Sequence, residues 1–263
     1  MPDRTEPTAR ADSSDTGSRT PHGDAVGAAL LDLDGTLLRT PALIIAEMAD
    51  EAHQVTGSRP EPETAWELVG RPLEEIALTL AAGDQAQAQL IVTGYRRRYL
   101  ARIVPAGERL LFPGVADGLD ALRRHGWLIA VVTNKSARGA AEILHSSGLR
   151  ARIDAVVGAD DTPHPKPHPS PVLTALDRLG VPTTRATMIG DTVHDIIAGN
   201  AAGVRTVGVT YGVGKRCDLA AAGADVIVDD FSRVIATLAE HIHDPSLLEA
   251  ATYDVRELGD RPA

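Results

Sequence analysis

Residues 28–36 have the sequence Ala-Ala-Leu-Leu-Asp-Leu-Asp-Gly-Thr. The apolar run is typical of a buried strand, and two carboxylates, a glycine and a hydroxyl follow it. If the strand breaks at Gly35, Asp32 and Asp34 can spread around one point beyond its carboxyl end, where open α/β sheets bind ligands. Two acids at such a point need a cation, and Mg²⁺ is the usual choice. The same residues are also good turn and capping chemistry, so this stretch alone leaves both interpretations open.

The composition is that of a soluble globular protein, with 43% hydrophobic and 24% charged residues in a chain of 263. A net charge of −10 argues against a nucleic-acid partner or an anionic membrane surface. The single cysteine, Cys217, excludes a disulfide within the chain and fits a reducing cytoplasm. No apolar run approaches the length of a membrane span, and no signal-peptide core is evident. We therefore expect a cytoplasmic protein.

Short apolar runs alternate with amphipathic patterns along most of the chain. The runs predict strands at 26–33, 128–133, 155–157, 186–189, 205–209 and 225–228. The amphipathic patterns predict helices at 115–124, 137–146, 171–179, 195–202 and 232–241. This alternation indicates an α/β fold: a Rossmann-like parallel sheet with helices on both faces.

One interval breaks the alternation, because residues 41–111 contain no convincing strand. Helical patterns occupy 43–55, 62–69, 73–81 and 85–103. We predict a helical cap at 41–111, inserted into a core formed by 25–40 and 112–242. Its position after the paired carboxylates suggests a lid over the site, and a purely structural insert is the alternative. Residues 1–24 are polar and predict a disordered tail, and 243–263 form a C-terminal tail.

Three further segments carry polar or charged side chains that could take part in a reaction. Thr133 and Asn134 end the second strand, where a hydroxyl, an amide and a helix N-terminus can hold a phosphate. Lys166 lies between prolines that restrict the backbone and can place a fixed positive charge. Asp191 and Asp195 open a helix after another strand and offer oxygens for Mg²⁺. Each also has a structural interpretation, as a helix cap or an exposed loop residue. Together with Asp32 and Asp34, these residues form the set of groups that phosphoryl transfer needs.

Four segments, in this order, resemble the motifs of the haloacid dehalogenase-like superfamily, and most closely its phosphoglycolate phosphatase-like branch. They are Asp32-Leu33-Asp34-Gly35-Thr36, Thr133-Asn134-Lys135, Lys166-Pro167 and Gly190-Asp191-x-x-x-Asp195. The resemblance spans about residues 26–241 and includes the helical cap. Within the cap, residues 70–74, Gly-Arg-Pro-Leu-Glu, resemble the substrate-facing loop. The chain departs from the family at Arg39, where an acid is common.

The resemblance implies a role for each matching residue. Asp32 would be the nucleophile and Asp34 the general acid/base, while Lys166 would steady the nucleophile and the phosphate. Phosphate or substrate binding would fall to Thr133, Asn134, Gly35 and Arg71. Mg²⁺ would be bound by Asp32, the Asp34 carbonyl and Asp191, with Asp195 completing or supporting this set.

These inferences lead to one functional hypothesis with alternatives. The hypothesis is a Mg²⁺-dependent phosphomonoester hydrolase that forms an aspartyl-phosphate on a small phosphorylated metabolite, with 2-phosphoglycolate as the first candidate. The alternatives are a sugar phosphomutase of the β-phosphoglucomutase kind, a pyrophosphatase, and a non-catalytic phosphate-binding module. Whether the protein is a monomer or a dimer stays open.

Overall fold

The computed structural model describes residues 25–241, so the predicted tails at 1–24 and 243–263 lie outside the described residues. Within this range, six parallel strands form one sheet in the order β3-β2-β1-β4-β5-β6. The strands are β1 (Gly27–Leu31), β2 (Trp127–Val132), β3 (Ala155–Val157), β4 (Ala186–Gly190), β5 (Arg205–Val209) and β6 (Val226–Val228). Each predicted strand is present, with bounds that differ by at most two residues.

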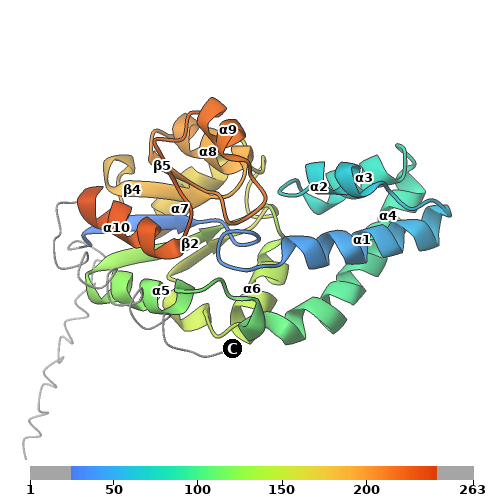
Figure 1. Ribbon diagram of the computed structural model, residues 1–263, viewed down its shortest axis with the longest axis horizontal. Helices are drawn as coiled ribbons and strands as arrows, with labels where there is room; N and C mark the ends of the chain where they lie inside the picture. Colours follow the sequence, from blue (N-terminus) through green and yellow to red (C-terminus); the bar gives the residue numbers. More distant parts are fainter. Residues whose placement is uncertain (1–24, 242–263) are drawn as a thin grey trace, which may run out of the picture.

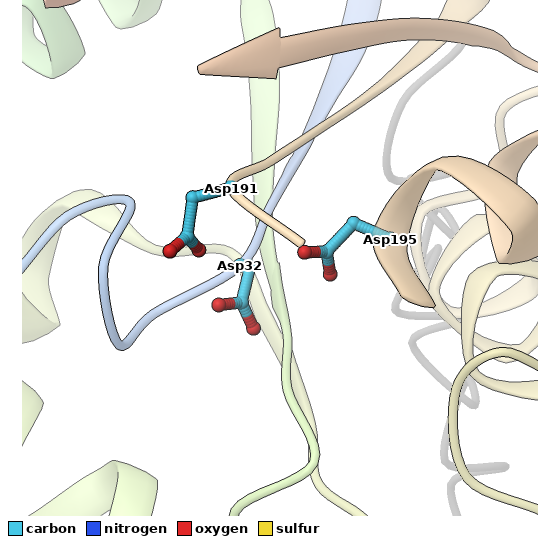
Figure 2. A group of neighbouring side chains, drawn as sticks. All are labelled: Asp32, Asp191 and Asp195. Carbon is cyan, nitrogen blue, oxygen red and sulfur yellow. The ribbon is translucent and has the colours of Figure 1, made fainter. Parts of the chain in front are cut away.

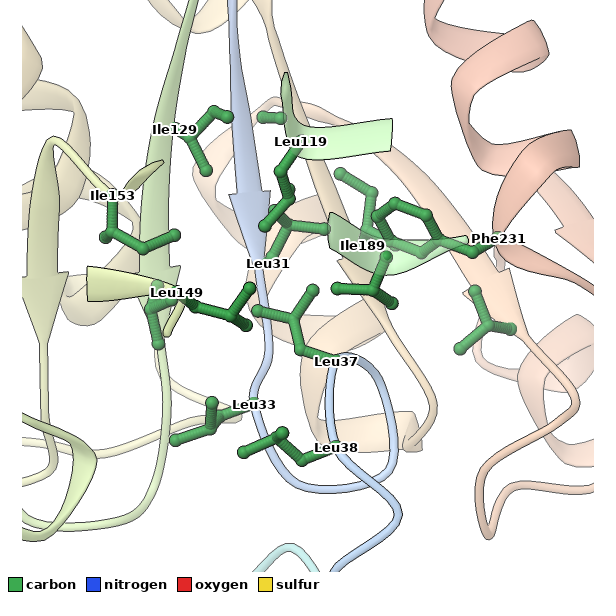
Figure 3. Close-up of a cluster of buried hydrophobic side chains, with 14 of the residues drawn as sticks. Leu31, Leu33, Leu37, Leu38, Leu119, Ile129, Leu149, Ile153, Ile189 and Phe231 are labelled. Carbon is green, nitrogen blue, oxygen red and sulfur yellow. The ribbon is translucent and has the colours of Figure 1, made fainter. Parts of the chain in front are cut away.

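Helices cover both faces of the sheet because successive side chains of a buried strand point to opposite sides. In β1, Ala29 and Leu31 pack with α5 (Val115–Arg124), α6 (Ala137–Ser146) and α10 (Phe231–His241). Ala28 and Leu30 face the other way, toward α7 (Ser170–Leu179) and α8 (Val193–Ala202). Figure 3 shows Leu31 on the first face, near Leu119 of α5. β1 is therefore buried on both sides, as its unbroken apolar sequence predicted.

A group of helices lies to one side of this core, at the right of Figure 1. It comprises α1 (Pro41–Thr56), α2 (Pro62–Glu67), α3 (Leu73–Leu80) and α4 (Gln85–Arg98), followed by η1 (Tyr99–Ile103) and η2 (Val104–Leu110). It has a small apolar cluster of its own, which includes Ala52, Ala77 and Ile91. The predicted α/β fold with an inserted helical cap is confirmed, whereas the exact domain boundaries stay predictions.

The last helix of the cap is less regular than the sequence predicted. We expected one helix over 85–103, but the α-helix ends at Arg98 and continues as the π-helical turn η1. The N–H of Val104 donates to the carbonyl of Tyr99, five positions earlier, which is the π pattern. Pro105 then offers no N–H, and the chain passes into the 3-10 helix η2. Other short elements are η3 (Arg150–Arg152), η4 (Thr183–Arg185) and α9 (Arg216–Ala221). No helix among the described residues is long and apolar enough to cross a bilayer.

The strand order explains where a site can form. From β1 the chain first builds outward through β2 and β3, and then returns to the other side of β1 with β4, β5 and β6. β1 therefore lies at the point where the direction of building reverses, which is where open α/β sheets leave a crevice. In register, Leu31 pairs with Val131 of β2 and with Ile189 of β4. The residues that follow these three positions consequently emerge side by side at one edge.

The buried position of β1 gives a stability prediction. Leu31 is fully buried, so Leu31→Ala removes packed methyl groups and should lower the free energy of unfolding by about 2–5 kcal/mol. Urea denaturation measures this change. Leu90→Ala is the matched control, because Leu90 is 58% exposed and should change stability by less than about 0.5 kcal/mol. Equal losses in the two variants would contradict the packing described here.

Candidate active site

Three buried carboxylates meet beyond the carboxyl ends of the central strands. Asp32 follows β1, Asp191 follows β4, and Asp195 lies in the first turn of α8. Each offers an oxygen within 4.8 Å of an oxygen of the other two (Figure 2). Asp191 and Asp195 are fully buried and Asp32 is 7% exposed. Their proximity is what the sequence predicted from two separate strand ends.

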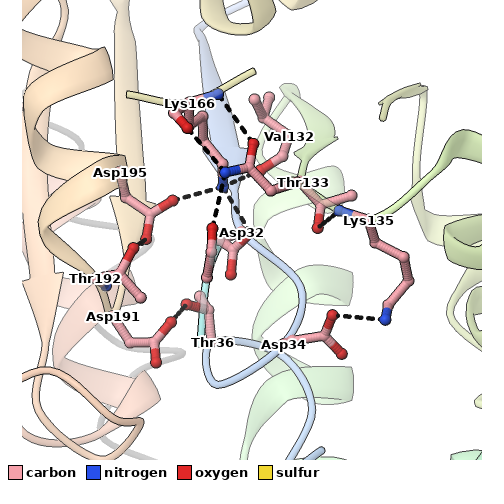
Figure 4. Close-up of polar contacts among 12 residues, drawn as sticks. Asp32, Asp34, Thr36, Val132, Thr133, Lys135, Lys166, Asp191, Thr192 and Asp195 are labelled. Atoms are coloured by element: carbon pink, nitrogen blue, oxygen red, sulfur yellow. Dashed lines mark hydrogen bonds and ion pairs between the residues drawn. The ribbon is translucent and has the colours of Figure 1, made fainter. Parts of the chain in front are cut away.

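The ammonium of Lys166 joins two of these carboxylates. Its Nζ lies 2.7 Å from Asp32 Oδ1 and 2.5 Å from Asp195 Oδ1, and it also donates to the carbonyl of Val132 at 2.7 Å (Figure 4). The side chain is 2% exposed. Burial acts to lower the pKa of Lys166, but Asp195 and Asp32 outweigh it and hold that pKa above its usual range. The lysine therefore stays charged and has all three of its donors satisfied.

Asn134 places Lys166, which lies in a loop well after β3. Asn134 Oδ1 accepts from the Lys166 N–H at 2.9 Å, and Asn134 Nδ2 donates to the Lys166 carbonyl at 2.8 Å. The second Nδ2 hydrogen is directed to the carbonyl of Gly70 in the cap, at 2.7 Å. Both amide hydrogens of Asn134 are thus engaged, so it acts here as a positioning residue. A direct phosphate contact by this amide would require the Gly70 contact to open.

Asp191 and Asp195 are held by different partners. Asp191 accepts from Thr36 Oγ1 at 3.1 Å and from the N–H of Val213 at 2.9 Å. Asp195 forms a capping box with Thr192, whose N–H and Oγ1 lie 3.0 and 2.7 Å from Asp195 Oδ2. Because Lys166 takes the other oxygen, both oxygens of Asp195 have donors. Asp195 therefore orients Lys166 and links it to the start of α8.

The cluster carries more negative than positive charge. Burial raises the pKa of Asp32 to about 7, with Lys166 opposing this shift and Asp195 and Asp34 adding to it. Burial also raises the pKa of Asp191 well above its usual value, and the nearby Asp32 and Asp195 charges contribute. A cation would stabilise the ionised forms of both acids. Clustered carboxylate oxygens are the donor set that Mg²⁺ prefers, so these residues fit a divalent metal.

The Asp34 side chain turns away from this cluster. Its Oδ1 accepts from Thr40 Oγ1 at 2.6 Å, and its Oδ2 lies 3.0 Å from Lys135 Nζ (Figure 4). Lys135 also lies 4.4 Å from the ring centre of Tyr99 in the cap. Both side-chain oxygens of Asp34 therefore contact groups outside the cluster, and the predicted metal contact through its main-chain carbonyl stays a prediction. Sequence reasoning assigned no role to Lys135, although its place directly after Asn134 was a usable signal.

Gly35 has a conformational role in the structure, and its predicted phosphate contact stays a prediction. Its φ is +93°, and a Cβ at this position would lie 2.1 Å from Asp191 Oδ2. Its N–H donates to the carbonyl of Leu38 at 2.8 Å, so that donor is already used. Only glycine allows both this left-handed turn and the close approach of Asp191.

A cavity of about 680 Å³ lies between the core and the cap. The predicted residues that line it are Asp32, Asp34, Arg71, Thr133, Asn134 and Lys166. Asp191, Asp195 and Gly35 lie outside its lining. Arg39 is also outside, where it donates to the carbonyl of Arg109 at 2.9 Å. Asp32 and Lys166 are therefore the members of the cluster that line the cavity, while Asp191 and Asp195 lie behind them.

Comparisons with known proteins agree with this arrangement. Residues 29–209 match the family model described as haloacid dehalogenase-like hydrolase. The probable phosphatase IndB of Dickeya dadantii is 35% identical over 78% of this chain and 90% of that protein. A phosphoglycolate phosphatase of Salmonella paratyphi A is 34% identical over 70% of this chain and 71% of its own length. The pyrophosphatase PpaX of Bacillus velezensis is 32% identical over 80% of this chain and 95% of its own length.

A solved structure shows the same fold. The crystal structure of a predicted phosphatase from Clostridium acetobutylicum is 25% identical and has a TM-score of 0.72. The similarity covers 82% of this chain and 99% of that one. The core and the helical insert are thus shared along nearly all of the solved chain.

The charge balance around Lys166 gives a prediction for the metal-free protein. Lys166→Met leaves Asp32 and Asp195 without their buried cation and should lower the free energy of unfolding by about 3–5 kcal/mol at neutral pH. Denaturation in EDTA measures this loss. Lys215→Met, at an exposed position, is the control and should be nearly neutral. An unchanged stability of Lys166→Met would contradict a structural role for this ion pair.

Proposed function

The chain belongs to the haloacid dehalogenase-like hydrolase family, in its phosphoglycolate phosphatase-like branch, and we propose that this phosphatase hydrolyses phosphomonoesters with Mg²⁺ through an aspartyl-phosphate. The observation that carries the proposal is the buried contact between Asp32 and Lys166 at the base of the cavity. It combines a carboxylate nucleophile with a fixed positive charge, which is what attack on an anionic phosphoryl group requires.

In the first step, an oxygen of Asp32 attacks phosphorus, and the bond from phosphorus to the leaving oxygen breaks. Lys166 Nζ, 2.7 Å from Asp32 Oδ1, orients the attacking carboxylate and offsets charge on the transferred group. The Thr133 hydroxyl, at the end of β2 and on the cavity wall, donates to a phosphoryl oxygen. The products of this step are the phosphorylated Asp32 and the leaving alcohol.

Asp34 is the proposed acid and base. It lines the cavity close to Asp32 in sequence, and Thr40 and Lys135 fix its orientation. It gives a proton to the leaving oxygen, and its carboxylate then takes a proton from water as that water attacks phosphorus. Phosphate leaves, the Asp32 carboxylate is restored, and Asp34 is again protonated.

The residues that would hold Mg²⁺ are Asp32, Asp191 and the main-chain carbonyl of Asp34, with Asp195 supporting them. When bound, the ion supplies positive charge that lowers the repulsion between the substrate and the attacking carboxylate. The Asp32–Asp191–Asp195 cluster supports this assignment, because its acids are buried with a single lysine among them.

Substrate identity belongs to the proposal as well. The names of the relatives indicate two small substrates, 2-phosphoglycolate and pyrophosphate. A sugar phosphomutase would use the same Asp32 chemistry but return the phosphoryl group to a sugar. A non-catalytic phosphate-binding module would release no phosphate at all. Phosphate release across a panel of these compounds therefore separates the candidate functions.

Replacement of the nucleophile is the direct test. Asp32→Asn keeps the shape of the side chain but removes its nucleophilic charge, so phosphate release with Mg²⁺ should fall by several orders of magnitude. EDTA should abolish release by the parent protein. Asp229→Asn, at a position that is 64% exposed, is the matched control and should keep full activity. Parent-level turnover by pure Asp32→Asn would refute the mechanism.

Replacement of the acid/base should separate the two steps. Asp34→Asn cannot protonate an alkoxide, so alkyl phosphates should lose about 10²–10⁴ in rate. An aryl phosphate, whose phenolate leaves without a proton, should give a burst of phenolate equal to the enzyme concentration and then slow turnover. Stopped-flow absorbance and the mass of phosphorylated Asp32 measure this. Equal losses of rate for the alkyl and aryl esters, with no burst, would show that Asp34 is not the acid/base.

A further inference from the structure

The cavity has two chemically different walls. The core wall carries the polar groups Asp32, Asp34, Thr133 and Lys166. The wall formed by the cap is mainly apolar, with side chains that include Ile45, Met48, Leu68, Val69, Ile76 and Tyr95. A phosphoryl group bound at Asp32 would therefore direct the rest of the substrate toward an apolar surface. A surface of this kind gains free energy by burying hydrocarbon rather than charge.

The cationic side chains of the cavity are already paired. Within residues 25–241, the lysines and arginines that line it are Arg71, Arg96, Lys135, Arg138 and Lys166, and each lies within 4.0 Å of a carboxylate. On the cap wall, Arg71 pairs with Glu75 and Arg96 with Glu74. On this wall, a second anionic group, such as the carboxylate of glycolate or the second phosphate of pyrophosphate, would thus meet cations whose charge is already partly offset by a neighbouring glutamate.

The size of the cavity is not the result of a displaced cap. Gly70 in the cap accepts a hydrogen bond of 2.7 Å from Asn134 in the core. A Cβ on Gly70 would lie 3.0 Å from Thr192 Cγ2, so the loop is also in contact with the start of α8. The volume of about 680 Å³ is present with this loop docked. It falls within the range of about 300–1,000 Å³ that is typical of pockets for ligands of drug size.

We infer that the leaving group is an alcohol with a large and mainly apolar body, aliphatic or aromatic, rather than glycolate or phosphate. This inference rests on the proposed phosphatase function and replaces 2-phosphoglycolate as the first candidate substrate. A hydrogen-bond acceptor on the body would also satisfy Arg71 Nε, which is buried and has no partner among the described residues. The core thus supplies chemistry common to phosphoesters, and the cap selects the alcohol.

A series of primary alkyl phosphates tests this inference, because their leaving groups have similar acidity and differ mainly in apolar size. The esters are ethyl, butyl, hexyl and 2-phenylethyl phosphate, with 2-phosphoglycolate and pyrophosphate measured in parallel. Each fully buried methylene should raise kcat/KM by roughly four-fold, so hexyl and 2-phenylethyl phosphate should exceed ethyl phosphate by at least ten-fold. They should also exceed 2-phosphoglycolate.

Variants of the cap wall link the preference to this cavity. Val69→Thr and Ile45→Thr make two half-buried lining positions more polar and should lower the ratio of kcat/KM for hexyl to ethyl phosphate by several-fold. Val55→Thr is the matched control, since Val55 is a half-buried residue of the same cap that does not line the cavity. Its hexyl-to-ethyl ratio should equal that of the parent.

The outcomes separate this inference from the function on which it rests. A flat alkyl series, or a clear preference for 2-phosphoglycolate or pyrophosphate, would overturn the inference and leave the phosphatase intact. An alkyl preference that the Val69 and Ile45 variants keep unchanged would also overturn it. Failure to hydrolyse any compound of the panel, by folded protein supplied with Mg²⁺, would instead overturn the proposed function itself.

Discussion

The ammonium of Lys166, buried between Asp32 and Asp195, is the interaction on which the site depends. Burying a lysine or a carboxylate alone is costly, and the cost is offset only when the partners are close and every donor is satisfied. Here the third donor of Lys166 reaches the carbonyl of Val132. Two neighbouring strand ends, a helix start and a distant loop must therefore be in place together before the charge is stable. Asn134 completes this requirement by fixing the backbone of Lys166 on both sides.

The remaining negative charge explains other features of the site. Among residues 25–241, Asp191 accepts from Thr36 and Val213 and pairs with no lysine, so a bound cation would stabilise its ionised form. Gly35 follows from the same crowding, because any side chain there would collide with the Asp191 carboxylate. The close approach of the Asp191 carboxylate thus constrains the turn after β1.

The core and the cap contribute different groups to the cavity. The core holds the proposed catalytic groups at its strand ends, whereas the cap contributes an apolar wall and contacts two side chains next to these groups. One contact is the carbonyl of Gly70 on Asn134, and the other is the ring of Tyr99 beneath Lys135. Since Lys135 pairs with Asp34, the position of the cap is linked by direct contacts to the proposed acid/base. The proposed proton transfer and the proposed selection of the substrate by the cap therefore involve neighbouring side chains.

Apolar periodicity and strand-end motifs are local signals, and they were enough to predict the strands, most helices and the grouping of Asp32, Thr133, Lys166, Asp191 and Asp195. In a parallel sheet such strand ends meet at one edge. The folded structure was needed to show which of these side chains already have a partner. Lys166 and Asp32 are 134 positions apart, and the sequence grouped them in one site, whereas Asn134 and Gly70 are 64 apart and the sequence did not pair them. Local sequence patterns contain no information on which distant side chains touch. For that reason the sequence did not predict the hydrogen bonds of Asn134, the Lys135–Asp34 pair or the ion pairs of the cavity cations.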